Sequence, residues 1–157
     1  MESQFNIYLS SADGNRPPIS NAVKEYFITF IIENVLAKKK LIIGGKWKVI
    51  LAIIFLSEGK RYSSAEIFLA KGGPRTITNE GVRLYEIIIP MKVIKEAEAP
   101  LLRTIELIYE AIKIFFTTTY KKVTPEFMDN LWKEVDLKYL LSLPYPAPLE
   151  EQKYVGD

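Results

Sequence analysis

The side chains that could do chemistry here are carboxylates, lysines, tyrosines and serines, because the chain contains neither histidine nor cysteine. Without those two residue types it cannot form a Ser-His-Asp or Cys-His nucleophile, or a Cys/His zinc site. Only four of its acidic residues are aspartates and no Asp-x-Asp spacing occurs, which disfavours a magnesium or calcium site. We therefore predict no catalytic residues, no metal site and no cofactor, and a binding protein rather than an enzyme.

Two short patterns could still belong to an enzyme. Gly44-Gly45-Lys46 resembles the end of a phosphate-binding loop, but the earlier glycine is missing and Trp47 replaces the metal-binding Ser or Thr, so a turn is the better interpretation. Glu66 and Glu86 lie in neighbouring predicted strands and could form the carboxylate pair of a hydrolase. No further convergent groups support that pair, and exposed strand positions explain both glutamates equally well.

A basic set with one aromatic residue is the strongest hint of nucleic-acid binding from residue types alone. Its members are Lys38, Lys39, Lys40, Lys46, Trp47, Lys48, Lys60 and Arg61. Against this hypothesis, lysines at a helix end are favoured by the helix dipole, and Trp47 begins an apolar strand in which we expect it to be core. A small nucleic-acid-binding module remains the alternative function, and a carboxylate-dependent hydrolase a further one.

Periodicity predicts four strands and three helices. Apolar and polar residues alternate over residues 5–10, 61–70 and 82–94, which is typical of strands. Residues 47–56 are apolar at odd and even positions alike, as in a strand covered on both faces. Pro90 cannot donate to a sheet ladder, so it should lie at a bulge, a strand end or an edge. Helical spacing covers residues 19–36, 101–120 and, after Thr124-Pro125, a third helix to about Leu141.

These elements predict an α+β domain in the order β-α-β-β-β-α-α. The first crossover makes the first two strands parallel, and the remaining strands follow as an antiparallel meander, giving a mixed, mostly antiparallel four-stranded sheet with three helices. The strand at residues 47–56 should be central. The inward stripes of the last two helices are predicted core, namely Ile105, Ile108, Ile112, Phe115, Leu131 and Val135.

Length and charge set the class of protein. The length of 157 residues favours a single domain over residues 1–157. The net charge of +2 gives too weak an electrostatic field to attract nucleic acid or anionic lipid. Its longest apolar run, Val49 to Leu56, is too short to span a membrane, and Met1 to Ser10 lacks the features of a signal peptide. We expect a cytoplasmic protein with an extended proline-rich segment over residues 142–157.

Taken as a whole, the order of elements resembles bacterial immunity proteins of polymorphic-toxin and contact-dependent growth inhibition systems. The residues that carry the resemblance are Ile7-Tyr8-Leu9-Ser10-Ser11-Ala12-Asp13, Arg61-Tyr62-Ser63-Ser64-Ala65-Glu66-Ile67 and the strand from Arg83 to Ile89. The resemblance implies a small cytoplasmic protein that binds one cognate toxin domain, often a nuclease, and blocks it without chemistry. One departure is the slightly basic charge, since an inhibitor of a basic nuclease is expected to be acidic.

We expect the partner-binding surface on loops and the tail, where a rigid scaffold presents charges without desolvating its own helices. Acidic and aromatic side chains of those segments would form it: Asp13, Glu58, Glu80, Tyr145, Glu150, Glu151 and Tyr154. The alternative is that the tail only straps the fold and that these carboxylates are solvated.

Overall fold

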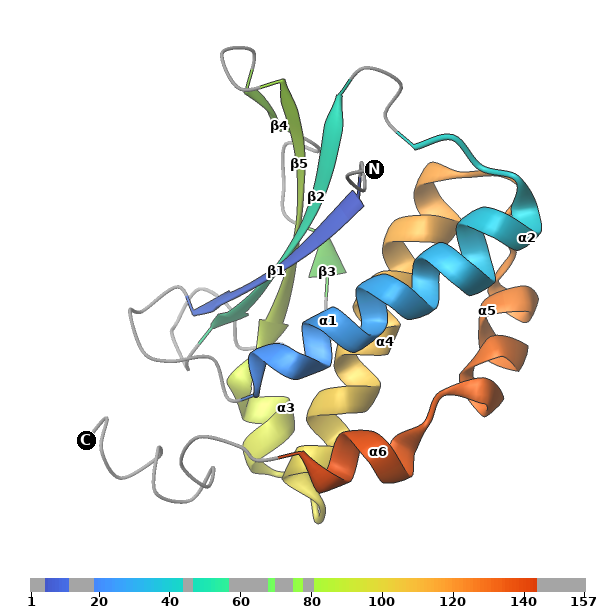
Figure 1. Cartoon of the computed structure of the whole chain (residues 1–157). Coiled ribbons are helices and arrows are strands. Elements are labelled where there is room, and N and C mark those ends of the chain that lie inside the picture. The colour runs from blue at the N-terminus through green and yellow to red at the C-terminus, as the bar shows by residue number, and fades with distance from the viewer. Residues whose placement is uncertain are drawn as a thin grey trace.

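Three long strands run side by side in the same direction in the computed structural model, which describes residues 5–11, 19–43, 47–56, 68–69, 75–77 and 81–143 (Figure 1). β2 (Lys48–Leu56) lies between β1 (Phe5–Ser11) and β5 (Val82–Pro90) and pairs in parallel with both. The prediction that residues 47–56 form the central strand is confirmed. Its unbroken apolar sequence suits a strand with neighbours on both sides and little contact with water.

Two short strands complete the sheet on the far side of β5. β3 (Phe68–Leu69) and β4 (Arg75–Ile77) both pair antiparallel with β5, and the sheet order is β1-β2-β5-β3. The predicted mostly antiparallel, four-stranded sheet is therefore wrong. It assumed that residues 61–70 pair with the strand before them, but β5 occupies that place beside β2. Of that predicted strand, residues 61–67 and 70 lie outside the described part of the chain.

The crossover between β1 and β2 is helical, as predicted for residues 19–36. α1 (Asn21–Ile31) begins after Ser20, whose hydroxyl accepts a hydrogen bond from the Ala22 N–H at 3.2 Å. It continues through a π-helical turn, η1 (Ile32–Leu36), into α2 (Ala37–Lys39). Lys40 then ends the helix in the left-handed region, with φ 52°. A π turn adds one residue to the helix, so it rotates everything after it about the helix axis.

The second half of the chain is more broken than the sequence predicted. Pro90 is the last residue of β5, which confirms a strand end, and the chain turns at once into the unpredicted helix α3 (Met91–Lys95). α4 (Pro100–Thr119) agrees with the prediction for residues 101–120. The predicted third helix is instead α5 (Pro125–Leu131), a 3₁₀ turn η3 (Trp132–Glu134) and α6 (Leu137–Ser142). The count of three helices is therefore wrong.

A long-range hydrogen bond explains why the third predicted helix breaks. Val135 is extended, with ψ 130°, and Asp136 caps α6 by accepting a hydrogen bond from the Tyr139 N–H. The Asp136 N–H donates to the Tyr26 hydroxyl of α1 at 2.8 Å. Because this partner is far away in the sequence, the local pattern from Thr124 to Leu141 cannot reveal the break.

All the described helices lie on one face of the sheet or at its lower end, and the core fills the space between these two layers (Figure 1). α1 packs on β1, and α4 packs on β2 and β5. Ring contacts link the layers: the Phe5 ring centroid lies 6.0 Å from that of Phe115 and 5.6 Å from that of Phe116. The six predicted core residues, Ile105, Ile108, Ile112, Phe115, Leu131 and Val135, are all buried. No described helix is both long and apolar enough to cross a membrane.

A buried tyrosine ties α4 to α5. The Tyr109 hydroxyl donates to the backbone carbonyl of Met128, and its ring centroid lies 5.0 Å from that of Trp132. Burial raises the pKa of the Tyr109 phenol, and the carboxylates of Asp129, Glu110 and Glu134 raise it further. Burial also raises the pKa of Tyr26 and Tyr120. The protonated phenol is thus the form that the folded chain stabilises.

We expect Ile112→Ala to lower the free energy of unfolding by about 2–5 kcal/mol, because it leaves a cavity at a fully buried position. Urea denaturation measures the change. Ile42→Ala is the matched control: Ile42 is 88% exposed, so its truncation should cost less than about 0.5 kcal/mol. A loss at Ile112 as small as that at Ile42 would contradict the observed packing of α4.

Tyrosine ionisation should make the protein sensitive to alkali. The folded state holds the Tyr109 proton more tightly than the unfolded state. The contribution of this phenol to the free energy of unfolding is therefore fully present below about pH 10 and is lost as the pH rises further. Tyr109→Phe should cost about 1 kcal/mol at pH 7 through the lost hydrogen bond, and should make the alkaline decline less steep. Urea denaturation between pH 7 and about pH 11 tests both effects. Equal alkaline slopes for the two proteins would contradict the assignment.

Candidate interaction surface

The seven predicted partner-binding residues, Asp13, Glu58, Glu80, Tyr145, Glu150, Glu151 and Tyr154, lie outside the described residues. The structure does fix where the segments that contain them begin. β1, β2 and β5 end at Ser11, Leu56 and Pro90, and the register places Ser11 opposite Phe55 and Leu56 opposite Pro90. We call this end of the sheet the carboxyl edge. The segments that contain Asp13 and Glu58 therefore start from neighbouring strand ends.

The tail leaves the body at the same end of the molecule. α6 lies near the beginning of α1, where the Tyr139 and Tyr26 ring centroids are 5.7 Å apart. Figure 1 shows the chain leaving α6 at the lower end of the molecule, where β2 and β5 also finish. Leu143, the last described residue, still packs against the core. The segment that contains Tyr145, Glu150, Glu151 and Tyr154 therefore begins on the side of the carboxyl edge.

Glu80 belongs to the opposite end of the sheet by its position in the chain. It directly precedes Gly81, whose carbonyl accepts a hydrogen bond from the Lys48 N–H at 2.8 Å, where β2 begins. Gly81 has φ 62°, a left-handed conformation that glycine adopts without strain at the turn into β5. The predicted acidic residues are therefore not all attached to one end of the sheet.

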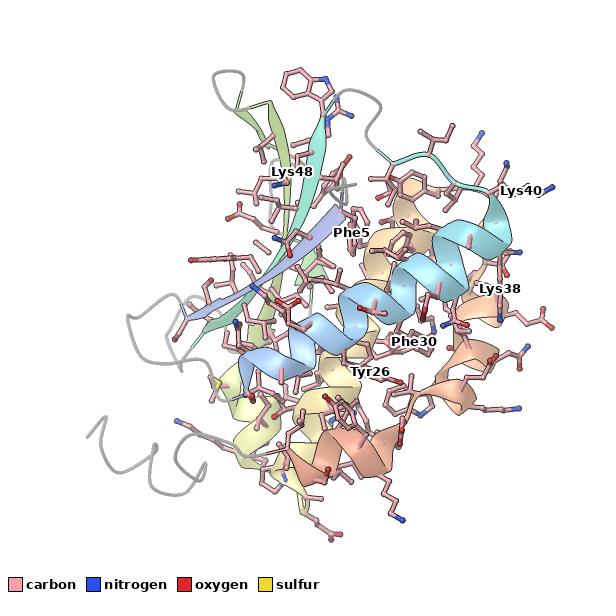
Figure 2. The ribbon with its side chains drawn as sticks, viewed as in Figure 1. Phe5, Tyr26, Phe30, Lys38, Lys40 and Lys48 are labelled. Atoms are coloured by element: carbon pink, nitrogen blue, oxygen red, sulfur yellow. The ribbon has the colours of Figure 1, made fainter. Side chains whose placement is uncertain are left out.

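The predicted basic set is divided by the sheet. Figure 2 shows Lys38 and Lys40 at the end of the helical crossover and Lys48 apart from them, on the sheet. Val49 and Leu51 of β2 are buried against the helices. Successive residues of a strand point to opposite faces, so Lys48 lies on the side of the sheet away from α2. Lys46, Lys60 and Arg61 lie outside the described residues.

Two of these lysines already have partners within the fold. Lys38 Nζ lies 3.9 Å from Glu134 Oε1, and Lys39 Nζ lies 4.3 Å from the centre of the Phe127 ring. Both contacts join α2 to the segment made of α5 and η3. Trp47, expected to be core, is only partly buried. The described members of the set thus do not form one continuous basic surface.

The face of the sheet that the helices leave uncovered was not predicted as a site. Its residues alternate with the core positions, and we call them the open face: Asn6, Tyr8, Ser10, Ile50, Ala52, Ile54, Leu84, Glu86 and Ile88. Tyr8 is 57% exposed, whereas Ile50, Ile54 and Leu84 are half-buried. The alternation of Phe5, Ile7 and Leu9 with more polar residues was the available signal, because it marks a strand with only one face in the core.

Glu86 lies in the middle row of the open face, in register with Ala52 and Tyr8. Its proposed partner Glu66 is outside the described residues, so the carboxylate pair remains an untested prediction. Among the residues that the structure describes, no group of three or more Asp or Glu side chains could hold a metal ion. The open face therefore combines apolar side chains with the phenol of Tyr8, the carboxylate of Glu86, the amide of Asn6 and the hydroxyl of Ser10.

The division of the basic set predicts weak affinity for nucleic acid. We expect no retention of single- or double-stranded nucleic acid at micromolar protein and about 150 mM salt, because binding would draw Lys38 and Lys39 away from their partners. Fluorescence anisotropy across a salt series measures this. Micromolar affinity with a steep salt dependence, lost in Lys40→Ala and Lys48→Ala, would restore the nucleic-acid hypothesis.

Comparison with known proteins gives no family for this chain. No family model matches it, and neither a curated protein nor a solved structure matches it. The resemblance to immunity proteins therefore stays a prediction, and what the chain binds has to be inferred from its own residues.

Proposed function

We propose that this chain is an immunity-type protein, which binds a cognate toxin domain and neutralises it by stoichiometric occlusion. The observation that carries the proposal is the convergence of chain segments at the carboxyl edge. The segment that contains Asp13 begins after Ser11, and the segment that contains Glu58 begins after Leu56. The tail begins after α6, at the same end of the molecule (Figure 1). Segments that follow the carboxyl ends of parallel strands are the usual place for binding residues on such sheets.

The surface next to these segments suits contact with a protein. The row of the open face closest to the carboxyl edge is Ser10, Ile54 and Ile88, and Tyr8 lies in the next row. Protein interfaces combine a central apolar and aromatic area with a polar rim. A toxin domain that covers the open face near this edge would meet the predicted acidic residues around it.

The local charge of the segments at the carboxyl edge has to be considered separately from the net charge of +2. Lys38 and Lys40 lie where the helical crossover ends, at the end of the molecule where β2 begins (Figures 1 and 2), and Lys39 is the last residue of α2 between them. The segments with Asp13 and Glu58 also carry basic residues, Arg16, Lys60 and Arg61, whereas the tail keeps an acidic excess, with Glu150, Glu151 and Asp157 against Lys153. An interface samples the local charge rather than the total, so a weakly basic chain can still complement a basic toxin.

The proposal predicts which charge reversals weaken toxin binding. The double variant Asp13→Lys/Glu58→Lys should raise the dissociation constant of the complex at least about tenfold, because it replaces attraction by like-charge repulsion. The partner to use is the product of the gene directly upstream, co-purified with this chain and measured by calorimetry. Toxicity of that product in cells, with and without each variant, gives a second readout.

The control variant is Glu33→Lys, since Glu33 is exposed on the crossover helix, toward the end at which the lysines lie. It should bind like the unchanged protein. If the double variant stays folded and neutralises the toxin equally well, the interface is elsewhere. If the upstream product does not bind the unchanged chain at all, the immunity function itself is wrong for that pair.

A further inference from the structure

β1 is an edge strand in the described part of the sheet. The sheet order places β2 on one side of it, and no described strand pairs with the other side. An edge strand presents a row of backbone N–H and C=O groups that can pair with another chain. The question is therefore what this edge would accept.

The direction of the backbone groups follows from one hydrogen bond. The Ile7 N–H donates to Oδ1 of its neighbour Asn6 at 2.8 Å, so it points to the outer edge rather than into the ladder with β2. In a parallel pair, alternate residues direct both backbone groups to the same neighbour. Leu9 has the same parity as Ile7, so its N–H and C=O also point outward, and the groups of Tyr8 point to β2.

The composition of β1 does nothing to prevent such pairing. Natural edge strands are usually protected by a lysine, a proline, a bulge or an inward-pointing charge. The sequence Phe5-Asn6-Ile7-Tyr8-Leu9-Ser10-Ser11 contains no charged residue and no proline. At the outer edge the Asn6 side chain covers the Ile7 N–H, and a backbone acceptor can take its place.

We propose that β1 pairs antiparallel with β1 of a second copy of this chain, so that two sheets become one continuous sheet. The two-fold axis passes beside Tyr8, the middle residue of the strand. Ile7 then exchanges backbone hydrogen bonds with Leu9 of the other copy, while Tyr8 faces its own symmetry mate at a non-hydrogen-bonded position, where side chains approach closely.

A second copy fits this edge because the strand is complementary to itself. In that register Ile7 lies opposite Leu9 on the helix side, and Asn6 lies opposite Ser10 on the open face, so each apolar residue meets an apolar residue and each polar residue a polar one. No like charges meet, which is the usual penalty when a strand pairs with its own copy. Tyr8, 57% exposed in the single chain, gains a ring contact.

Antiparallel pairing also leaves the proposed binding ends apart. The carboxyl edges of the two copies point in opposite directions along the continuous sheet, while both helix layers lie on its same face, because the two-fold axis is perpendicular to the sheet. The dimer is tested with the purified chain alone, so a failure of this proposal is distinguishable from a failure of the proposed toxin binding.

The first measurement is sedimentation equilibrium of the full chain over a concentration series. We expect a reversible dimer with a micromolar dissociation constant, since one strand pair makes a small interface. Tyr8→Lys should raise that constant at least about tenfold, because it places two ammonium groups opposite each other. Ile42→Lys is the matched control: Ile42 is 88% exposed and far from β1 in the chain, so the dimer should persist.

The second measurement uses the absence of cysteine from the chain. In Tyr8→Cys the two thiols would lie on Cα atoms about 4.5 Å apart, within the span of a disulfide, so mild oxidation should link the copies. Ile42→Cys should link far more slowly. Overturning results are a wild-type monomer at about 100 µM, a dimer that Tyr8→Lys leaves intact, or equal cross-linking of both cysteine variants. Amide hydrogen exchange gives a further test. If the chain is a monomer and its Leu9 amide is protected from exchange only when the toxin domain is bound, the edge pairs with a strand of the toxin and the proposal is wrong.

Discussion

The rest of the structure depends on the burial of β2 between two parallel neighbours. Val49, Leu51, Ile53 and Phe55 are all almost completely buried against the helix layer, and Ala52 between them is 5% exposed on the other face. A strand of this composition is stable only if both of its edges are paired and its core face is covered. Parallel neighbours in turn require long connections, which is why a helix stands between β1 and β2 and why a long stretch of chain separates β2 from β5.

Much of the fold could be predicted from local patterns, because each pattern reports on its own segment. Alternation located β1 and β5, the unbroken apolar run located β2, and the stripe from Ile105 to Phe115 located α4 and its buried side. The partners of the strands could not be predicted in this way. Nothing in the alternation of Val82 to Pro90 distinguishes pairing with β2 from pairing with the preceding strand. The mostly antiparallel sheet was inferred from chain order, and chain order was misleading here.

The helices also show that local patterns do not reveal long-range partners. Thr124 and Pro125 mark the start of α5 correctly, because capping is a local property. The break at Val135 depends on Tyr26, which contacts Asp136 only after α1 has packed beside α6. The π turn at Ile32–Leu36 is also invisible to a helical stripe with constant period, yet it sets the direction in which Lys38 and Lys39 leave the helix. Lys38 and Lys39 therefore contact Glu134 and Phe127, whereas the nucleic-acid hypothesis treats the adjacent lysines at this helix end as facing one ligand.

The one-sided arrangement of helices has a consequence for where the chain can bind anything. The helix side is closed by ring packing among Phe5, Phe115 and Phe116 and by tyrosines whose hydroxyls are bonded or buried, so opening it would disrupt the core. The open face has no such constraint, since Tyr8, Ile50 and Leu84 are held by a rigid backbone while their side chains stay partly accessible. A surface of this kind binds with little loss of conformational entropy, because the sheet is already ordered before contact. The sequence indicates this face only in β1, through alternation; in β2 and β5 the apolar side chains of an uncovered face look the same in the sequence as those in a core. The open face therefore became visible only when the structure showed that every described helix lies elsewhere.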